Sequence, residues 1–247
     1  RLPLAMLALA CLSAFSVGWA AYRTVSSWAE TAAGEHLSLL ADSHAQVIEQ
    51  RWQRLHAEVA VQARSAYAVS MIDALAQWME INPQSLRDIT DYFRDDPAVA
   101  PADRRRRSGV DHRTAYSWRH VPIHETYLSV LQQFGYADIY LVAPNGRVVY
   151  SVTKGPEFGR LLSAPELAGT GLAQAVTAAA RLPANQQATV DFAPYDLIGG
   201  PPRAFIAQQF RNADGGGEVM GTFVVSVGPR FIEESLSALS ASSPQIR

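Results

Sequence analysis

The chain has 247 residues and a formal net charge of −2, so it lacks the overall basic excess that would suggest a nucleic-acid partner. Its single cysteine, Cys11, lies in an apolar N-terminal run, so the rest of the chain has neither a disulfide nor cysteine-based chemistry. We therefore expect no nucleic-acid partner, and a domain whose stability comes from a hydrophobic core rather than from disulfides.

An uncharged run over residues 2–22 opens the chain and is followed by Arg23. As a helix it would be about 30 Å long, which matches the hydrocarbon core of a bilayer. The run predicts a transmembrane helix over 1–22 that binds the inner (cytoplasmic) membrane. The residues after 23 are then expected in the periplasm or another extracytoplasmic space.

Two other readings of this run stay open. Gly18 and Ala20 are small residues at the spacing of a signal-peptidase site, which is compatible with a cleaved signal peptide. Cys11 follows Leu9 and Ala10, which is compatible with a lipoprotein signal, although the apolar run continues well beyond the cysteine. The usual apolar region of a signal peptide is shorter than this run, which favours an uncleaved helix.

Residues 23–133 are predicted to form a helical stalk. Residues 24–78 contain no proline, and their apolar positions recur at helical spacing. The apolar stripe consists of Leu37, Leu40, Val47, Ile48, Trp52, Leu55, Val59 and Ala63. A helix this long needs a partner for its stripe, either from the same chain or from a second subunit. Because the short helix near 85–94 cannot cover the whole stripe, we expect a homodimer. A short helix near 85–94 and another over 122–134 flank a polar loop near 95–117, whose arginine run over 104–107 is typical of a solvated segment.

Residues 134–232 have the composition and pattern of a β-rich lobe. β-Branched and aromatic segments predict five strands, over 137–142, 147–152, 188–192, 204–210 and 219–227. Asn145-Gly146 predicts a tight hairpin between the first two, and Asp214-Gly215-Gly216-Gly217 a loop between the last two. A helix is expected over 164–181, and 233–247 is expected to be an exit helix or linker. The predicted fold is α+β, with a five-stranded antiparallel sheet covered by helices.

Three segments resemble the sensor regions of bacterial methyl-accepting chemotaxis receptors and related transmembrane sensors. They are FGYADIYLVAPNGRVVYSVTKGPEFG (134–159), VDFAPYDLIGGPPRAFIAQQF (190–210) and GTFVVSVGPRFIEESL (221–236). The resemblance implies an extracytoplasmic lobe of the PAS-like Cache type on a helical stalk. The chain departs from the family pattern at Gly155, where an acid is frequent, at Arg160-Leu161 and at Gln208-Gln209.

No catalytic or metal-binding constellation is present in the sequence. The histidines do not form an H-E-x-x-H pair, and His120 and His124, four residues apart, supply too few ligands for a zinc site by themselves. No serine stands in a G-x-S-x-G context, and no glycine-rich loop precedes a helix. We expect no enzymatic activity, no metal and no cofactor.

Five residues of the lobe are predicted to contact a small-molecule ligand: Tyr150, Lys154, Asp191, Tyr195 and Arg203. Lys154 and Arg203 are suited to a ligand carboxylate, and Asp191 to a ligand ammonium. Asp191 and Tyr195 are expected to form one wall of a pocket, with Tyr150 and Lys154 opposite. Each also has a structural reading, in which Tyr150 belongs to the core, Lys154 is solvated and Asp191 caps a turn.

The sequence thus predicts the extracytoplasmic small-molecule sensing region of a transmembrane, chemoreceptor-type signalling protein, with a ligand of unknown identity. Two alternatives remain. The chain is a membrane-anchored structural or protein-interaction module without a small ligand, or it is the sensor region of a histidine kinase or nucleotide cyclase.

Overall fold

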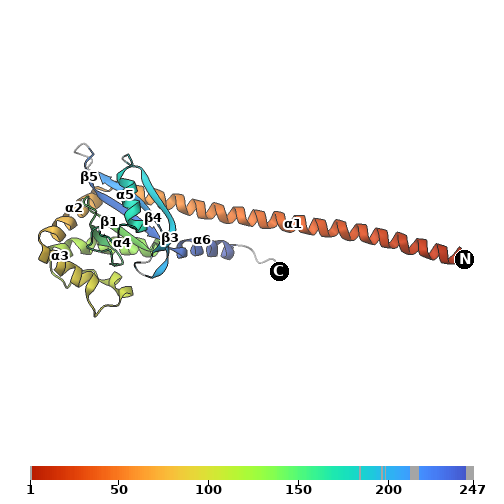
Figure 1. Cartoon of the computed structure of the whole chain (residues 1–247), viewed down its shortest axis with the longest axis horizontal. Coiled ribbons are helices and arrows are strands. Elements are labelled where there is room, and N and C mark those ends of the chain that lie inside the picture. Colours follow the sequence, from red (N-terminus) through yellow and green to blue (C-terminus); the bar gives the residue numbers. More distant parts are fainter. Residues whose placement is uncertain (1, 184, 196, 198, 212–216, 243–247) are drawn as a thin grey trace. The chain divides into compact units, whose positions relative to one another are not determined.

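The computed structural model describes residues 2–183, 185–195, 197, 199–211 and 217–242 (Figure 1). It divides into two compact units, residues 1–50 and 51–247. Most of the loop predicted at 214–217, and the end of the predicted exit segment at 243–247, lie outside the described residues.

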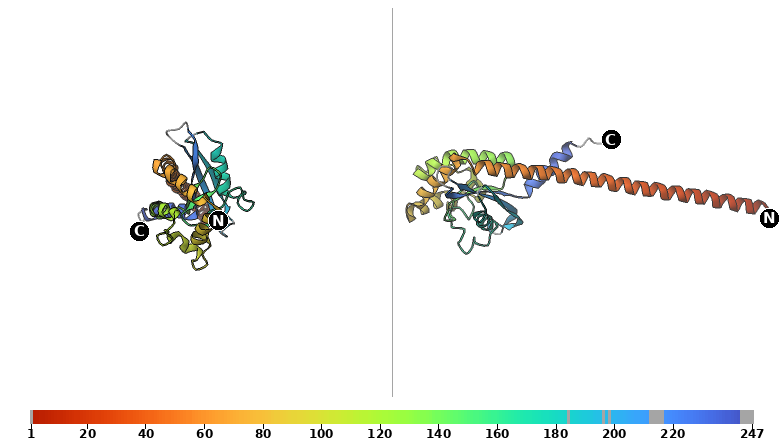
Figure 2. Two further views of the ribbon diagram at one scale, coloured as in Figure 1. Left: turned by 90° about the vertical axis from the view of Figure 1, so that its left-hand side faces the viewer. Right: turned by 90° about the horizontal axis from the view of Figure 1, so that it is seen from above.

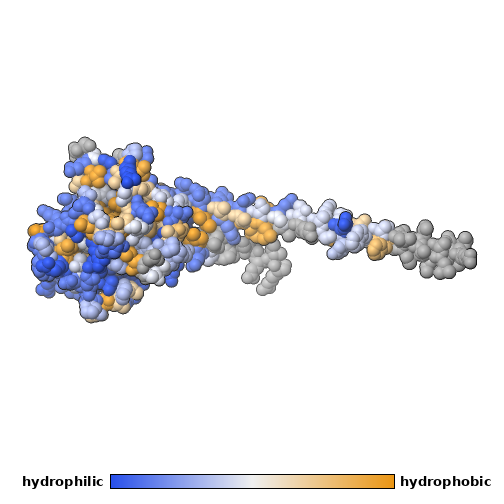
Figure 3. Space-filling view, viewed as in Figure 1, coloured by the Kyte–Doolittle hydropathy of each residue, from blue (hydrophilic) through white to orange (hydrophobic). Residues whose placement is uncertain are grey.

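The first unit consists of the N-terminal part of helix α1 (Leu2–Gln62), which is continuous over 61 residues. Its exposed apolar side chains include Val25, Trp28, Leu37 and Leu40. The space-filling view shows apolar patches along this otherwise mainly hydrophilic helix (Figure 3). The homodimer expected from this stripe stays a prediction.

The membrane-spanning helix predicted over 1–22 is wrong. The apolar run is not a separate element, because α1 continues without a break through Arg23 and Glu35 to Gln62. Among the residues that the structure describes, no helix combines the length and the apolar character that a bilayer crossing requires. The same finding contradicts the predicted location in the inner membrane.

The second unit begins with the last turns of α1 and contains the remaining elements. Its helices are α2 (Ala66–Glu80), α3 (Pro83–Thr90), the π-helical turn η1 (Asp91–Asp95), the 3-10 turn η2 (Pro101–Arg106), α4 (Ala115–Phe134), α5 (Gly171–Ala180) and α6 (Pro229–Ser242). The single helix expected over 24–78 is interrupted at Ser65, whose hydroxyl accepts a hydrogen bond from the backbone N–H of Ala68 and starts α2.

The sheet of the second unit confirms the predicted α+β class and the five antiparallel strands. The strands are β1 (Asp138–Val142), β2 (Val148–Ser151), β3 (Gln187–Tyr195), β4 (Gly200–Arg211) and β5 (Val219–Val227). Their spatial order is β2-β1-β5-β4-β3, so β5, the last strand in the chain, lies at the centre of the sheet. In register, Val225 of β5 lies opposite Ile139 on one side and Ile206 on the other.

Helices cover both faces of this sheet. α5 packs on β3, β4 and β5, whereas α2 and α4 pack on the opposite face, as two views show (Figures 1 and 2). Because strand side chains alternate, Ile139 and Leu141 contribute to the core on the α4 side, and Tyr140 and Val142 to the core on the α5 side. The two faces therefore carry separate cores and separate sets of buried polar groups.

A buried carboxylate, Asp138, organises the corner after the β1–β2 hairpin. Its Oδ1 accepts backbone N–H groups of Ile139 at 2.7 Å, Val152 at 2.9 Å and Thr153 at 3.2 Å. Its Oδ2 accepts the hydroxyls of Ser151, at 2.7 Å, and of Thr153. These bonds satisfy a charge that would be costly to bury alone, and they hold the chain where it leaves β2.

Candidate ligand-binding site

The structure does not bring the five predicted ligand residues together. Tyr150 and Lys154 are buried on the α4 side of the sheet, whereas Tyr195 is buried in the α5-side core. Arg203 also lies on the α5 side, over the Tyr195 ring. Asp191 is exposed on the edge strand β3, and its Oδ1 accepts the backbone N–H of Phe192 at 2.7 Å. The expected arrangement of two facing walls is therefore not observed.

The α4 side contains the Lys154 cluster, which we define as His120, His124, Tyr150 and Lys154. The ammonium Nζ of Lys154 lies 3.1 Å from both ring nitrogens of His124, and His124 Nδ1 lies 3.1 Å from Tyr150 Oη. His124 Nε2 lies 2.8 Å from the carbonyl oxygen of Arg105. Because a carbonyl only accepts, Nε2 carries the proton, and Nδ1, which has a single lone pair, accepts from either Tyr150 or Lys154.

The electrostatics of the Lys154 cluster favour neutral histidines. Burial and the Lys154 charge lower the pKa of His124 to about 3, and the same causes lower that of His120 well below its ordinary value. Burial also lowers the pKa of Lys154 itself. Lys154 is fully buried, which excludes its reading as a solvated lysine, and none of the ion pairs of the described residues includes it.

The α5 side contains the Glu157 cluster, which we define as Tyr140, Glu157, Tyr195 and Arg203. Arg203 Nη1 donates to Tyr140 Oη at 3.1 Å, and its guanidinium carbon lies 5.2 Å from the centre of the Tyr195 ring. Glu157 is 1% exposed. Its Oε2 and the Tyr195 hydroxyl are buried and make no hydrogen bond of good geometry, although the Tyr140 hydroxyl lies close enough to interact with both residues. The hydroxyl of Ser226, which lies opposite Phe205 on the same face of the sheet, is also buried without a partner.

The charges of this cluster act on one another. Burial, followed by the charge of Asp138, raises the pKa of Glu157. Burial lowers the pKa of Arg203, because it disfavours the charged guanidinium. The opposing effect of nearby groups is larger and raises this pKa; these groups are Tyr140, Asp138 and Glu157. Glu157 and Arg203 do not form one of the ion pairs found among the described residues. An acid and a cation thus share one buried region without neutralising each other by direct contact.

Buried polar atoms in native proteins are nearly always hydrogen-bonded, so unpartnered ones mark positions for water or a ligand. In the Glu157 cluster, Arg203 offers a planar set of donors that fits a carboxylate. Glu157 Oε2 offers an acceptor, and the Tyr195 hydroxyl offers either function. Together these groups complement a small molecule that carries both a carboxylate and an amine.

Of the four residues of the Glu157 cluster, the sequence analysis named Tyr195 and Arg203 as ligand contacts but not Glu157 or Tyr140, and the ligand contacts stay a prediction. The signal for Glu157 was its place in the quoted segment TKGPEFG, where the resemblance to chemoreceptors has an acid just before Phe158-Gly159. The acid chosen instead, Asp191, lies in β3 within the first of two register irregularities, which fall between Val190 and Ala193 and between Ala193 and Tyr195. Alternation along a regular strand therefore does not predict where these side chains point.

Comparison with solved structures finds only weak structural likeness. No family model and no curated protein matches the chain. One of the solved structures that it matches weakly is the sensor domain of the V. cholerae histidine kinase DctB. The identity is 17%, the TM-score is 0.34, and the match covers 67% of this chain and 56% of that chain. A likeness of this size assigns no function.

Proposed function

We propose that the chain is a small-molecule sensing domain of a chemoreceptor-type signalling protein, and that its ligand binds at the Glu157 cluster. The observation that carries the proposal is the set of three buried polar atoms that lack a well-formed hydrogen bond, on Glu157, Tyr195 and Ser226, on the face that also holds Arg203. The resemblance of residues 134–159 and 190–210 to chemoreceptor sensor regions supports the same reading.

The chemistry of the cluster favours a zwitterionic ligand such as a free amino acid. Arg203 would bind the ligand carboxylate through two parallel N–H···O bonds, and Tyr195 would donate a further one. Glu157 Oε2 would accept from the ligand ammonium, which also compensates the buried carboxylate. A ligand with only one of these groups would leave either Glu157 or Arg203 without its counter-charge.

The edge strand β3 provides a physical connection from this cluster to α1. Tyr195 ends β3, and Gln187 begins it. The Gln187 amide donates to the His56 carbonyl oxygen at 2.8 Å and to Gln208 Oε1 at 2.9 Å, and its oxygen contacts His56 Nδ1. A ligand that fixes Tyr195 would thereby bias the position of β3 against α1, provided that it binds two arrangements with different affinity.

The test is a thermal-shift screen of free amino acids, organic acids and amines with the whole chain. A ligand at a hundred times its dissociation constant adds about 2.7 kcal/mol of stability. For a chain of this size that corresponds to a rise in melting temperature of roughly 5–10 °C.

Three variants and a control then locate the site. We expect Glu157→Gln and Arg203→Gln to abolish the shift, and Tyr195→Phe to weaken binding by about 0.5–1.5 kcal/mol through one lost hydrogen bond. Asp191→Ala, which removes an exposed acid, is the matched control. If Asp191→Ala abolishes binding and Glu157→Gln does not, the ligand lies on the outer side of β3. If no compound raises the melting temperature, the alternative of an interaction module without a small ligand is favoured.

A further inference from the structure

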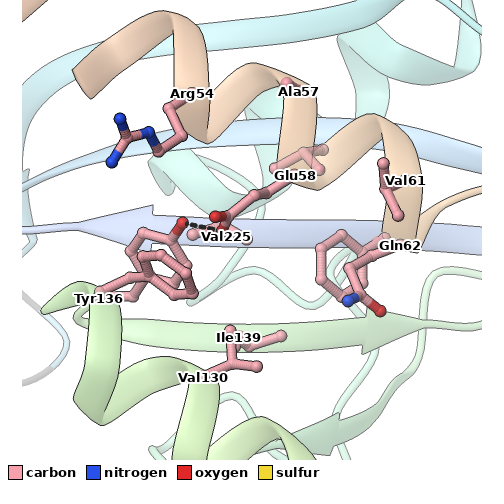
Figure 4. Close-up of a pocket in the computed structure, with 12 residues that line it drawn as sticks. Arg54, Ala57, Glu58, Val61, Gln62, Val130, Tyr136, Ile139 and Val225 are labelled. Atoms are coloured by element: carbon pink, nitrogen blue, oxygen red, sulfur yellow. Dashed lines mark hydrogen bonds between the residues drawn. The ribbon is translucent and has the colours of Figure 1, made fainter. Parts of the chain in front are cut away.

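An apolar pocket lies on the α4 side of the sheet, on the face opposite the Glu157 cluster. It has a volume of about 350 Å³ and is enclosed by α1, the C-terminal part of α4, β1 and β5. Figure 4 shows α1 passing over the strands that carry Ile139 and Val225, with Val130 of α4 completing the wall. The volume falls within the roughly 300–1,000 Å³ of small-molecule sites.

The interior of the pocket is apolar. Its deep wall is formed by Val59, Ile139, Phe223 and Val225, each at most 2% exposed. These side chains offer no hydrogen bonds, so water gains little by entering this space. A hydrocarbon group, in contrast, is stabilised there because it leaves water. The occupant that fits such a wall is an alkyl chain or an aromatic ring.

The polar groups stand at the rim. Glu58 accepts a hydrogen bond of 2.6 Å from the Tyr136 hydroxyl, and burial and this bond raise the pKa of Tyr136, which therefore stays protonated as a donor. Arg54 is exposed, and neither the hydrogen bonds nor the ion pairs of the described residues include its guanidinium. Figure 4 shows Arg54 and Gln62 at opposite ends of the α1 segment that borders the pocket. Of the two charged residues at the rim, Glu58 accepts a hydrogen bond from a neutral hydroxyl, whereas no described residue uses the donors of Arg54; neither belongs to an ion pair of the described residues.

We propose that this pocket binds an amphipathic monocarboxylate, with its hydrocarbon part against Val59, Ile139 and Val225 and its carboxylate on Arg54. Glu58 is already engaged by Tyr136, whereas the Arg54 guanidinium offers all of its donors. Since the occupant would contact both α1 and the strands, it would stabilise one arrangement of α1 on the sheet. The site is independent of the Glu157 cluster, because it lies on the other face of the sheet.

The experiment compares three ten-carbon probes that differ only in their head group: decanoate, decanol and decylamine. Binding to the whole chain is measured by titration calorimetry below the aggregation concentration of each probe. We expect saturable one-to-one binding, with decanoate at least tenfold tighter than decanol and decylamine the weakest. A tighter decylamine complex, or non-saturable uptake of all three, would overturn the assignment.

Variants separate the head group from the tail. Arg54→Gln should lower decanoate affinity about tenfold, to the level of decanol, and leave decanol unchanged. Ala57→Phe places a ring at the exposed rim of the pocket and should weaken decanoate and decanol alike. Val61→Trp, at a second exposed lining position, gives the same test if Ala57→Phe does not fold.

Two controls keep the outcome interpretable. Arg64→Gln removes an exposed arginine that does not line the pocket and should change none of the affinities. Arg203→Gln disables the proposed zwitterion site and should also leave decanoate binding intact, so failure of one site is distinguishable from failure of the other. Decanoate affinity that is unchanged in both Arg54→Gln and the folded rim variant would refute the proposal.

Discussion

Acid should destabilise this protein through His124, because the folded state keeps that histidine neutral. Its pKa is about 3 in the folded protein and near 6.5 for an exposed histidine. Between these two values the unfolded chain binds more protons than the folded protein, so the free energy of unfolding falls as the pH decreases. At pH 5, which lies about 1.5 pH units below the ordinary pKa, the loss from His124 is about 2 kcal/mol at 1.36 kcal/mol per unit.

Other groups in the lobe titrate in the same range, so the measurement must isolate His124. The lowered pKa values of His120 and Lys154 act in the same direction, whereas the raised pKa of Glu157 acts in the opposite one. The assay is urea unfolding at pH 7 and pH 5 of the unmodified chain, of His124→Gln and of His36→Gln. His36 is exposed on α1 and serves as the matched control.

The glutamine variant retains an oxygen that can accept from Tyr150 and an N–H that can donate to Arg105, but it cannot titrate. We expect its loss of stability between pH 7 and pH 5 to be about 2 kcal/mol smaller than that of the unmodified chain. His36→Gln should lose as much stability between pH 7 and pH 5 as the unmodified chain. Equal losses in the unmodified chain and His124→Gln would refute the reasoning, since they would mean that His124 does not resist protonation in the folded state.

Three further predictions concern the architecture. Asp138→Asn removes a charged acceptor from two hydroxyls and should lower the free energy of unfolding, measured in urea, by at least about 3 kcal/mol. An unchanged urea midpoint would contradict a stabilising role for the hydrogen bonds of Asp138. Gly221→Ala should cost about 2–3 kcal/mol in the same assay, because φ is +148° and a Cβ would lie 2.3 Å from Ile72 Cδ1. Leu40→Cys, in a chain with Cys11 replaced by serine, should form a disulfide-linked dimer visible on a non-reducing gel. Absence of crosslinking at every position of the stripe would exclude the dimer.

Local patterns in the sequence were sufficient to locate the five strands along the chain, because strand alternation and turn chemistry depend on neighbouring residues. Asn145-Gly146 lies between β1 and β2 as predicted, and Gly146 adopts the positive φ that this turn requires. Helix starts were less predictable. α4 was expected from Pro122, since proline is common in a first turn, but it begins at Ala115, where the Thr114 hydroxyl accepts the backbone N–H of Ser117.

The composition of the candidate site depended on tertiary structure. Tyr140 and Arg203 are 63 residues apart, and they meet because β5 lies between β1 and β4 and brings both strands into one sheet. The chain leaving β2 buries Lys154 with His124 on one face, while Glu157, three residues later, interacts with Tyr140 on the other. Residue spacing indicates that these side chains carry useful chemistry. Which of them face each other is decided by strand order and by the path of the chain after each strand, because neither is encoded in any short window of the sequence.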